Sequence, residues 1–560
     1  MFLKIRHQNN KTYLSLVESY RDGSTSRHRT VVSLGELGQY NESSLYSIAN
    51  KLLSLRGLSS SNVADFRKSE ILKTYNWGAT AVIRKLWSKL DLDYVLNEAF
   101  EGSRVKFNAN ETIFNIVLNR LTHPASKLKL YSHQDDIAGI QKPDLNHYYR
   151  ALDVLAKNKE AVEELMFKNS SKPFSKEVDV VLYDVSTLYF ESVSSDELRK
   201  KGWGKDGKSS EVQVVVGLSV DKTGRPLSFD VFPGNTYEGH TLISVLEKFK
   251  SRFSIDKVVI VADRGINNRD NLAKIRESGF DYVFGHRFKN AEGELKRSIL
   301  DLESYTVISK DSEGNAQLAV KEIFLDKKEP ESGKRDRLIC SWSLARAVKD
   351  AKEREKNIEK AKYLIANPHK LEDKRGCKKY IKAIELAEEG NGSKKAVELN
   401  VEQITKDSTY DGFYTIQTSD TSLTAAEVLT AYKHLWKIEE SFRVLKSSLE
   451  TRPIYHWTPH RVAGHLVCCF IALTVERALE SILTKKGVDH SVDRIREAIN
   501  KMSVSKVKLT DEEPEIYLHQ SLNSDEYKLS RDILKALGIN IPRSYMTKEQ
   551  FEAAYEKLTM

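Results

Sequence analysis

Residues 180–192, VVLYDVSTLYFES, begin as a strand and place an aspartate, Asp184, where the first apolar run stops. The residues from Thr187 to Phe190 continue the extended pattern, and strands of this kind are usually buried on both faces. A carboxylate in such a place is costly unless a cation or another partner compensates its charge. The stretch therefore predicts a central strand that carries a carboxylate for a specific purpose.

A second stretch, residues 257–275 (KVVIVADRGINNRDNLAKI), repeats this pattern. Five apolar residues lead into Asp263, and Gly265 then breaks the strand before a helical pattern begins. In open sheets, sites form where the carboxyl ends of parallel strands meet the loops. Asp184 and Asp263 share one site if their strands are neighbours, whereas each one taken alone is equally well explained as a strand-end or N-cap aspartate.

The order of elements between residues 178 and 287 indicates which strands are neighbours. Three strands are expected first, and the turn DKTG (221–224) joins the second and third strands as a hairpin. A helix, a strand, a helix and a last strand follow. This order is typical of an RNase H-like sheet, in which the first and fourth strands are parallel neighbours, and these two strands carry Asp184 and Asp263. The predicted fold class is therefore α/β with an RNase H-like catalytic core.

Changes of pattern along the 560 residues divide the chain into six regions. Between about 40 and 170 the segments are helical and carry basic residues, whose faces either bind DNA or are simply solvated. These basic residues are Arg84, Lys85, Lys89, Arg120, Lys127 and Lys129. The predicted regions are a β hairpin element (1–35), a helical DNA-binding region (36–175), the first part of the core (176–287), an inserted α+β domain (288–423), the core helix with a glutamate (424–457) and a helical C-terminal region (458–560).

Composition narrows the class of protein only moderately. Lys and Arg number 88 against 79 acidic residues, and the resulting charge of +9 suggests a polyanionic partner without identifying it. The four cysteines form no CxxC pair and have no zinc-like spacing to histidines, which favours a reducing compartment. The longest apolar stretch, residues 466–475, is about half of what a bilayer span needs. We expect a cytoplasmic protein without a membrane partner and without a signal peptide.

A helix predicted over residues 425–449 supplies a third carboxylate. Tyr432, Glu439 and Lys446 are spaced by seven residues, so they project from one stripe of this helix. If the helix packs against the sheet edge, Glu439 joins the two aspartates, and the three carboxylates repel one another until divalent cations neutralise them. A single glutamate is more often a solvated partner of Lys or Arg, and Glu440 is the rival position, although it lacks the seven-residue register.

Oxygen ligands of this kind suit magnesium or manganese. Two such ions about 4 Å apart activate water or a 3′-hydroxyl on one side of a phosphodiester and stabilise the leaving oxygen on the other. Lys446 and Tyr432 would then contact phosphates, which positions DNA without reading its sequence. The pattern predicts nuclease or strand-transfer chemistry.

Four stretches together resemble one known family: YDVSTLYFES, VQVVVGLSVDKTGRPLSFDVFPGNTYEGHTL, VADRGINNRDNL and YKHLWKIEESFRVLKSSLETRPIYH. They are similar to the DDE transposases of bacterial insertion sequences, in the superfamily with the signature Tyr-x2-Arg-x3-Glu-x6-Lys and a large insertion before the glutamate. The resemblance implies that Asp184, Asp263 and Glu439 are the metal-binding catalytic triad, which holds two Mg²⁺ ions, or Mn²⁺. It also implies that Tyr432 and Lys446 contact phosphates.

The same resemblance implies an activity and partners. The expected protein binds the terminal inverted repeats of its own element, cuts at their ends and joins the 3′-hydroxyls to target DNA. It is expected to act on transposon-end DNA and target DNA as a homodimer in the bacterial nucleoid. Two alternatives are a nuclease of the same fold without strand transfer and a domesticated DNA-binding protein, although a binding module needs none of the three carboxylates.

One signature position departs from the family pattern. The family's arginine falls at residue 435, where this chain has Leu435. At 100° per residue, Leu435 and Arg443 lie about 40° to either side of Glu439, so Arg443 is a candidate for the missing DNA contact. A surface ion pair of Arg443 with Glu439 or Glu440 is the equally weighted alternative. The inserted domain also departs, because the family's is β-rich and this one contains a charged helical run at 345–365.

Overall fold

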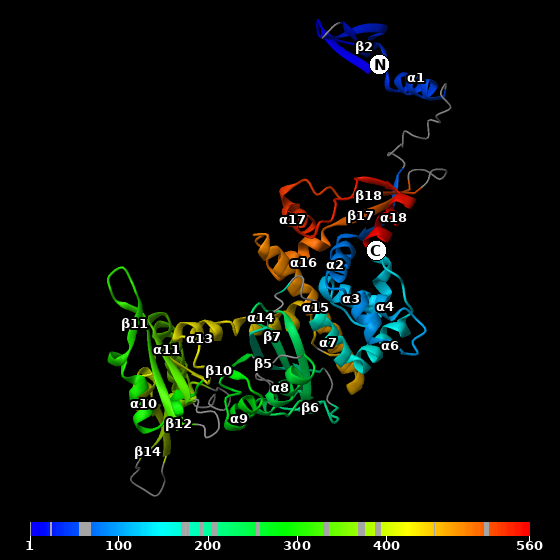
Figure 1. Cartoon of the computed structure of the whole chain (residues 1–560). Coiled ribbons are helices and arrows are strands. Elements are labelled where there is room, and N and C mark those ends of the chain that lie inside the picture. The colour runs from blue at the N-terminus through cyan, green and yellow to red at the C-terminus, as the bar shows by residue number, and fades with distance from the viewer. Residues whose placement is uncertain are drawn as a thin grey trace. The chain divides into compact units, whose positions relative to one another are not determined.

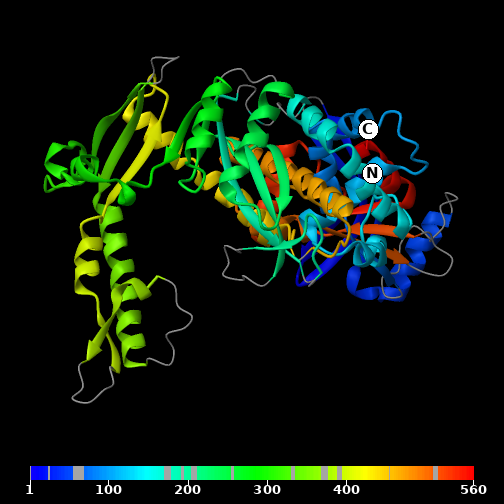
Figure 2. The same cartoon turned by 90° about the horizontal axis from the view of Figure 1, so that it is seen from below.

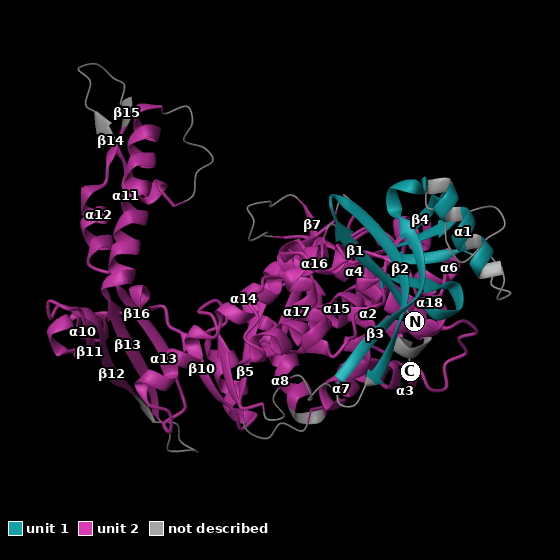
Figure 3. Ribbon diagram, turned by 90° about the horizontal axis from the view of Figure 1, so that it is seen from above, with its two compact units in different colours: residues 1–74, 505–518, 544–551 teal, residues 75–504, 519–543, 552–560 magenta. Residues whose placement is uncertain are grey.

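The structure is a computed structural model, and its elements are shown in chain order in Figure 1. It describes residues 2–22, 25–54, 69–169, 174, 178–190, 194–202, 211–253, 258–328, 335–367, 376–386, 394–452, 454–508 and 515–559. The chain divides into two compact units, which are coloured separately in Figure 3. Unit 1 comprises residues 1–74, 505–518 and 544–551, and unit 2 comprises residues 75–504, 519–543 and 552–560.

Unit 1 contains two small sheets. The hairpin expected near the N-terminus is present as strands β2 and β3, and β1 adds a third antiparallel strand beside β2. The bounds are β1 (Phe2–Gln8), β2 (Lys11–Asp22), β3 (Thr25–Glu36), η1 (Leu37–Gln39) and α1 (Glu42–Ser54). A second sheet has the order β19-β18-β17-β4, with β4 (Glu70–Asn76), β17 (Ser503–Lys508), β18 (Ile516–His519) and β19 (Tyr545–Thr547), and α18 (Lys548–Thr559) follows it.

Unit 2 is built around a ten-stranded mixed sheet. Its first strands in the chain are β5 (Val180–Tyr189), β6 (Lys200–Lys201), β7 (Val212–Asp221), β8 (Pro226–Pro233), β9 (Val259–Ala262) and β10 (Asp281–Gly285). Strand β5 is antiparallel to β7 and parallel to β9, and β9 is parallel to β10. The predicted parallel pairing of the first and fourth core strands is therefore confirmed, as is the hairpin turn, in which Gly224 N donates to Asp221 O at 2.9 Å.

Burial explains why these segments form central strands. Every residue of β7 is buried, as expected for a strand that is covered on both faces. On one face, α8 (Leu242–Ser251) and α9 (Arg269–Glu277) contribute to a core that includes Tyr183, Phe249 and Tyr282. Because side chains alternate along a strand, Asp184 projects from the face of β5 opposite to Tyr183. Asp184, a candidate catalytic residue, therefore does not point into this apolar core.

The insertion continues the same sheet. Strand β16 (Phe413–Thr418) pairs antiparallel with β10 on one side and with β13 (Arg335–Ser343) on the other. Strands β12 (Ala316–Lys328) and β11 (Thr306–Lys310) complete the series, after α10 (Gly293–Leu300). The inserted region therefore contributes strands to the sheet as well as helices.

The charged run predicted as a helix is α11 (Leu344–Ala366). In Figures 2 and 3 it lies beside α12 (Val401–Ser408), and the hairpin of β14 (Ile381–Leu386) and β15 (Lys394–Leu399) lies at one end of the pair. A small core of Ala361, Leu364, Cys377 and Tyr380 packs with partly buried residues of β14, β15 and α12. The insertion therefore combines a sheet extension with a separate helical arm.

The remaining helices of unit 2 pack around α15 (Pro459–Lys485). The other bounds are α2 (Gly78–Lys89), α3 (Leu92–Ala99), α4 (Ala109–Thr122), α5 (Lys127–His133), α6 (Leu145–Lys157), α7 (Lys159–Asn169), α16 (Val492–Asn500) and α17 (Lys528–Leu537). The helix α15 contacts α2, α4, α6 and α17, and the apolar stretch at 466–475 is a buried part of it. All four cysteines are buried thiols. No described helix is long and apolar enough to cross a membrane.

Three of the basic residues expected on DNA-binding faces lie inside the protein instead. Arg84 pairs with Glu111, Arg120 donates to the carbonyl of Glu450 at 3.2 Å, and the Lys127 ammonium lies 3.4 Å from His465 Nδ1. Each side chain belongs to a residue that is less than 7% exposed. Burial next to Arg120 also lowers the pKa of Lys127 to about 8. These cations stabilise the helical packing, and Lys85, Lys89 and Lys129 remain at least partly exposed.

Candidate active site

The two aspartates stand side by side at the ends of neighbouring strands. Tyr183 of β5 is paired with Ala262 of β9, so Asp184 and Asp263 are the next residues on the two parallel strands. Strand β9 ends there, whereas β5 continues to Tyr189 beside β7. Asp184 is partly buried and Asp263 is exposed. The parallel register therefore brings together the two carboxylates that the sequence singled out.

Hydrogen bonds orient the Asp263 carboxylate. The backbone N–H of Arg264 donates to its Oδ1 at 2.6 Å, and the Tyr432 hydroxyl donates to the same oxygen at 3.4 Å. The turn after the strand closes when Ile266 N donates to Asp263 O at 3.2 Å. Gly265 lies in this turn, and a Cβ there would lie 3.4 Å from the carboxylate of Glu238. The turn is thus a crowded, polar end to β9.

The helix expected over 425–449 is interrupted twice. Helix α13 (Ala425–Lys433) and helix α14 (Trp436–Arg443) are separated by a turn, and a π-helical segment follows at Val444–Ser448. At the turn, Leu435 N donates to the carbonyl of Tyr432, three residues earlier. At the end of the π-helical segment, Leu449 N donates to the carbonyl of Val444, five residues earlier. The prediction of one uninterrupted helix is therefore wrong, because a tight turn and a wide, π-helical segment divide it into three.

The two helices nevertheless lie along the strands that carry the aspartates. Helix α13 contacts β9 and β10, and α14 contacts β5 and β7 (Figure 1). A capping box at Thr424 and Glu427 fixes the start of α13 directly after the insertion. The sheet thus positions Tyr432 near Asp263 and places the glutamate helix over β5.

Glu439 and Glu440 have different surroundings. Glu440 forms ion pairs with Arg477 at 3.3 Å and with Arg443 at 3.4 Å. Glu439 is exposed on α14. The ion pair predicted as the alternative role of Arg443 is therefore present, and the Arg443 side chain is 73% exposed.

The other predicted site residues lie on the same helical segments. Leu435 is buried, which agrees with its apolar character at a position where the family has arginine. Lys446 is partly exposed in the π-helical segment. Trp436 is 50% exposed, with the Lys437 ammonium 3.9 Å from its ring, whereas Trp342 packs against the core of the insertion.

A polar cleft of about 730 Å³ opens beside Asp263. One wall comes from the ends of β9 and β10, and the other comes from the insertion, including α11 and α12. Its cationic residues are Arg264, Arg287, Lys289, Arg346, Arg354 and Lys379. Its acidic residues are Asp263, Asp350, Glu353, Asp407 and Asp411, and Arg346, Arg354 and Lys379 form ion pairs with three of them, so the cleft carries mixed charge.

The paired aspartates fit a divalent metal in their chemistry. Mg²⁺ prefers oxygen ligands and is often held by one or two carboxylates together with waters and substrate phosphates. Asp184 and Asp263 supply two such carboxylates in neighbouring register. Across the described ranges, no group of three or more His, Cys, Asp or Glu side chains is gathered closely enough to hold a metal ion, so Glu439 does not close a cluster with the aspartates here.

Sequence reasoning missed two residues at this site, Tyr414 and Gly285. Tyr414 lies on β16 of the insertion and donates a hydrogen bond to the Tyr432 hydroxyl. Gly285 ends β10, and a Cβ there would lie 2.7 Å from the Tyr432 hydroxyl oxygen. The alternating strand FYTIQT reads as ordinary core, so only the pairing of β16 with β10 reveals the position of Tyr414.

Comparison with known proteins identifies the family. Residues 176–475 match the model described as "Transposase DDE domain", and residues 3–58 match "IS1634 family transposase, N-terminal domain". The search of curated proteins returns no match. A solved structure titled "Cryo-EM structure of piggyBac transposase synaptic complex with hairpin DNA" has a TM-score of 0.38 and 9% identity, with 84% of this chain and 87% of that chain covered, and a likeness this weak supports no inference. The DDE domain alone spans more than half of the 560 residues, and the chain therefore belongs to the DDE transposases of bacterial insertion sequences.

Proposed function

We propose that this transposase binds the terminal inverted repeats of its insertion sequence, cleaves their ends and joins the 3′-hydroxyls to target DNA. The observation that carries the proposal is the register of β5 and β9, which places Asp184 beside Asp263 within the family match. The strand order β8-β7-β5-β9-β10, in which β5 is parallel to β9, supports an RNase H-like core.

In this proposal Asp184, Asp263 and Glu439 would hold two divalent cations, Mg²⁺ or Mn²⁺. When bound, these ions supply Lewis-acid activation of water or a 3′-hydroxyl and stabilisation of the leaving oxygen. The protein residues themselves orient the reacting groups. The backbone N–H of Arg264 and the Tyr432 hydroxyl hold Asp263 Oδ1, and the ion pairs of Glu440 anchor α14 so that Glu439 stays exposed.

DNA contacts follow from the cations near these carboxylates. Lys446 is proposed to contact a phosphate as a point charge, and Tyr432 lies beside Asp263, where a phosphate at the site would also lie. Arg443 exposes its guanidinium on α14 and could bind a phosphate bidentately after it leaves Glu440. We propose that two copies of the chain hold the two ends.

Two other functions compete with this one: a nuclease without strand transfer and a DNA-binding protein without chemistry. The decisive experiment incubates the full chain with labelled DNA that carries the ends of its own element, a supercoiled target plasmid and Mg²⁺. Cleavage at the ends together with labelled joint molecules supports transposition. Cleavage without joint molecules supports the nuclease, and specific binding without cleavage supports the binding protein.

A further inference from the structure

Tyr414 is connected to Asp263 through a chain of two hydroxyl groups. The Tyr414 hydroxyl donates to the Tyr432 hydroxyl, and the Tyr432 hydroxyl donates to Asp263 Oδ1 at 3.4 Å. The two rings pack at a centroid distance of 5.4 Å with a 48° tilt. The three residues come from β16, α13 and the end of β9, so the connection joins the insertion to the catalytic sheet.

The surroundings hold this pair in place. A Cβ at Gly285 would lie 2.7 Å from the Tyr432 hydroxyl oxygen and 2.9 Å from that of Tyr414, so the glycine leaves the space that the hydroxyls occupy. On the insertion side, the Arg346 guanidinium of α11 lies 4.4 Å from the centre of the Tyr414 ring. Strand pairing, a glycine and a cation therefore converge on one hydrogen-bonded contact.

Both phenols remain protonated at neutral pH, as donors must. The ordinary pKa of a tyrosine hydroxyl is about 10, which is well above neutral pH. A neutral phenol has one O–H group, so each tyrosine donates to only one acceptor at a time. The direction of donation therefore runs from Tyr414 to Tyr432 to the carboxylate.

We propose that Tyr414 is a positioning residue that acts through Tyr432 to orient the Asp263 carboxylate for its metal, so that the insertion sets the geometry of the active site. This inference rests on the proposed function, because it assumes that Asp263 binds a divalent cation. The Arg264 backbone N–H and the Tyr432 hydroxyl both donate to Oδ1 of Asp263. Residues that hydrogen-bond to metal ligands in this manner change metal affinity or activity by about 10- to 100-fold when they are removed.

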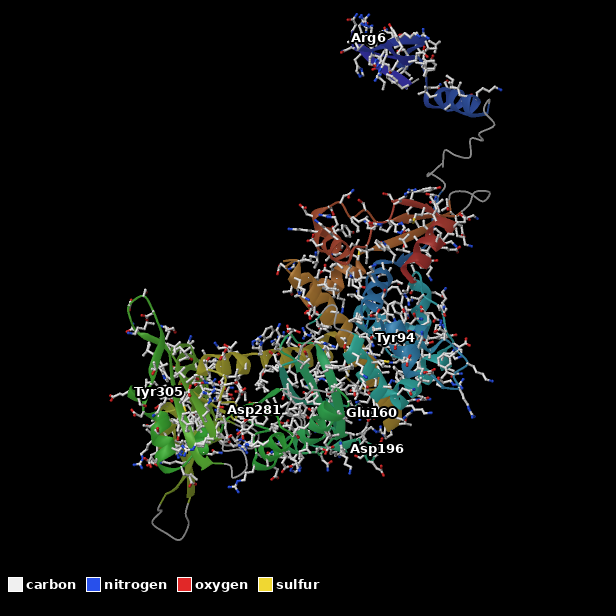
Figure 4. The ribbon with its side chains drawn as sticks, in the orientation of Figure 1. Arg6, Tyr94, Glu160, Asp196, Asp281 and Tyr305 are labelled. Carbon is white, nitrogen blue, oxygen red and sulfur yellow. The ribbon has the colours of Figure 1, made fainter. Side chains whose placement is uncertain are left out.

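The test measures Mn²⁺ binding by the full chain without DNA, from the loss of the free Mn²⁺ signal in electron paramagnetic resonance. Tyr414→Phe keeps the ring and removes only the hydroxyl, and it should weaken Mn²⁺ binding by roughly tenfold. Gly285→Ala should weaken it as well, because the added methyl group displaces both hydroxyls. The matched control is Tyr305→Phe, because the buried Tyr305 hydroxyl belongs to the same insertion and donates to Ile299 O at 2.6 Å. Figure 4 labels Tyr305.

A double mutant separates positioning from a general structural effect. If Tyr414 acts only through Tyr432, then Tyr414→Phe combined with Tyr432→Phe should bind Mn²⁺ as weakly as Tyr432→Phe alone. If the fold-losses of Mn²⁺ affinity in the two single variants multiply in the double variant, Tyr414 acts independently of Tyr432, and this result overturns the proposal. Equal Mn²⁺ affinity of Tyr414→Phe, Tyr305→Phe and the wild-type chain overturns it too.

Asp263→Asn distinguishes failure of this inference from failure of the proposed function. Weaker Mn²⁺ binding in Asp263→Asn establishes the site, so that an unchanged affinity in Tyr414→Phe contradicts the positioning role alone. If Asp263→Asn keeps the wild-type affinity, the metal site and the positioning role are both wrong. The melting temperature of each variant shows that the chain is folded.

Discussion

Arg477 of α15 forms an ion pair with Glu440 of α14 at 3.3 Å, and its own side chain is only 6% exposed. Successive residues on a helix point about 100° apart, so this anchor turns Glu439 to a different side of α14. The ion pair therefore distinguishes two adjacent glutamates that the sequence alone leaves as rivals. It gives the first prediction a matched pair of variants.

Glu439→Gln should abolish cleavage of end DNA and leave binding of that DNA intact, because it removes a proposed metal ligand without changing helix packing. Glu440→Gln should retain cleavage but lower the free energy of unfolding by about 1–2 kcal/mol, since Arg477 loses one charged partner. Cleavage assays and urea unfolding of both variants test this. The opposite assignment, with activity lost only in Glu440→Gln, would show that the wrong glutamate was chosen.

Asp184→Asn and Asp263→Asn should each abolish cleavage while end binding stays within about twofold of wild type, because they change metal ligands and not phosphate contacts. EDTA should have the same effect on the wild-type chain. Gel-shift and cleavage assays on one labelled end measure both properties. Residual cutting by both variants in Mg²⁺ would exclude the aspartate pair as the catalytic centre.

Arg443→Ala should slow cleavage and reduce the salt dependence of end binding by about 0.9 in the slope of log K against log[salt], the value for one phosphate contact. Arg494→Ala is the control, because Arg494 is a surface arginine paired with Asp489 at 2.7 Å on α16. Binding titrations from low to moderate salt give the slopes. Identical slopes for the two variants and wild type would leave Arg443 with its Glu440 ion pair as its only role.

Lys85 and Lys89, which are partly exposed, and Lys129, which is exposed, should contact DNA if residues 36–175 recognise the ends. Replacing all three with alanine should lower the salt slope by up to about three units. A second variant without residues 2–54 tests the N-terminal sheet and α1 of unit 1 separately. If the triple variant binds normally and the truncated chain loses its preference for end DNA, recognition belongs to the small sheet and α1 instead.

Glu476 should make stability depend on pH. Burial is the main cause that raises the pKa of Glu476 to about 8 from its ordinary 4.5; Glu480 and Asp493 act in the same direction, and Arg477 and Arg496 oppose them. Between pH 4.5 and 8 the folded chain binds this proton more tightly than the unfolded chain, so the contribution of Glu476 to stability should fall as the pH rises. The lowered pKa values of His456 and His519 act in the opposite direction, so the test compares two chains at each pH. Glu476→Gln should gain melting temperature relative to wild type as the pH rises from about 5.5 to about 8, and a constant offset between the two chains would contradict the assignment.

Much of the core was predictable because its information is local. Apolar runs that end in Asp184 and Asp263, together with the hairpin turn at 221–224, are enough to order the strands. The helix with Glu439 was placed correctly in the sequence, but its two interruptions were not. They arise where α13 and α14 adapt to different strands of the sheet, and this packing leaves no mark in a seven-residue spacing.

The remaining features depend on contacts between distant segments. Arg120 and Lys127 resemble surface cations in the sequence, yet they are enclosed by residues more than 300 positions away. The same holds for Tyr414, which meets Tyr432 and Asp263 only because β16 pairs with β10. Periodicity reports one element at a time, so it cannot show which polar residues the fold brings together.

The pairing of β10 with β16 also affects how the protein unfolds. Val283, Phe284 and Gly285 pair with Thr418, Gln417 and Ile416, so the insertion supplies the strand that covers the outer edge of the catalytic sheet. A chain without the insertion would expose that edge, and an uncovered flat edge invites pairing with other chains. We therefore expect the insertion strands and the core strands to unfold together, and a chain without the insertion would need another element to cover this edge.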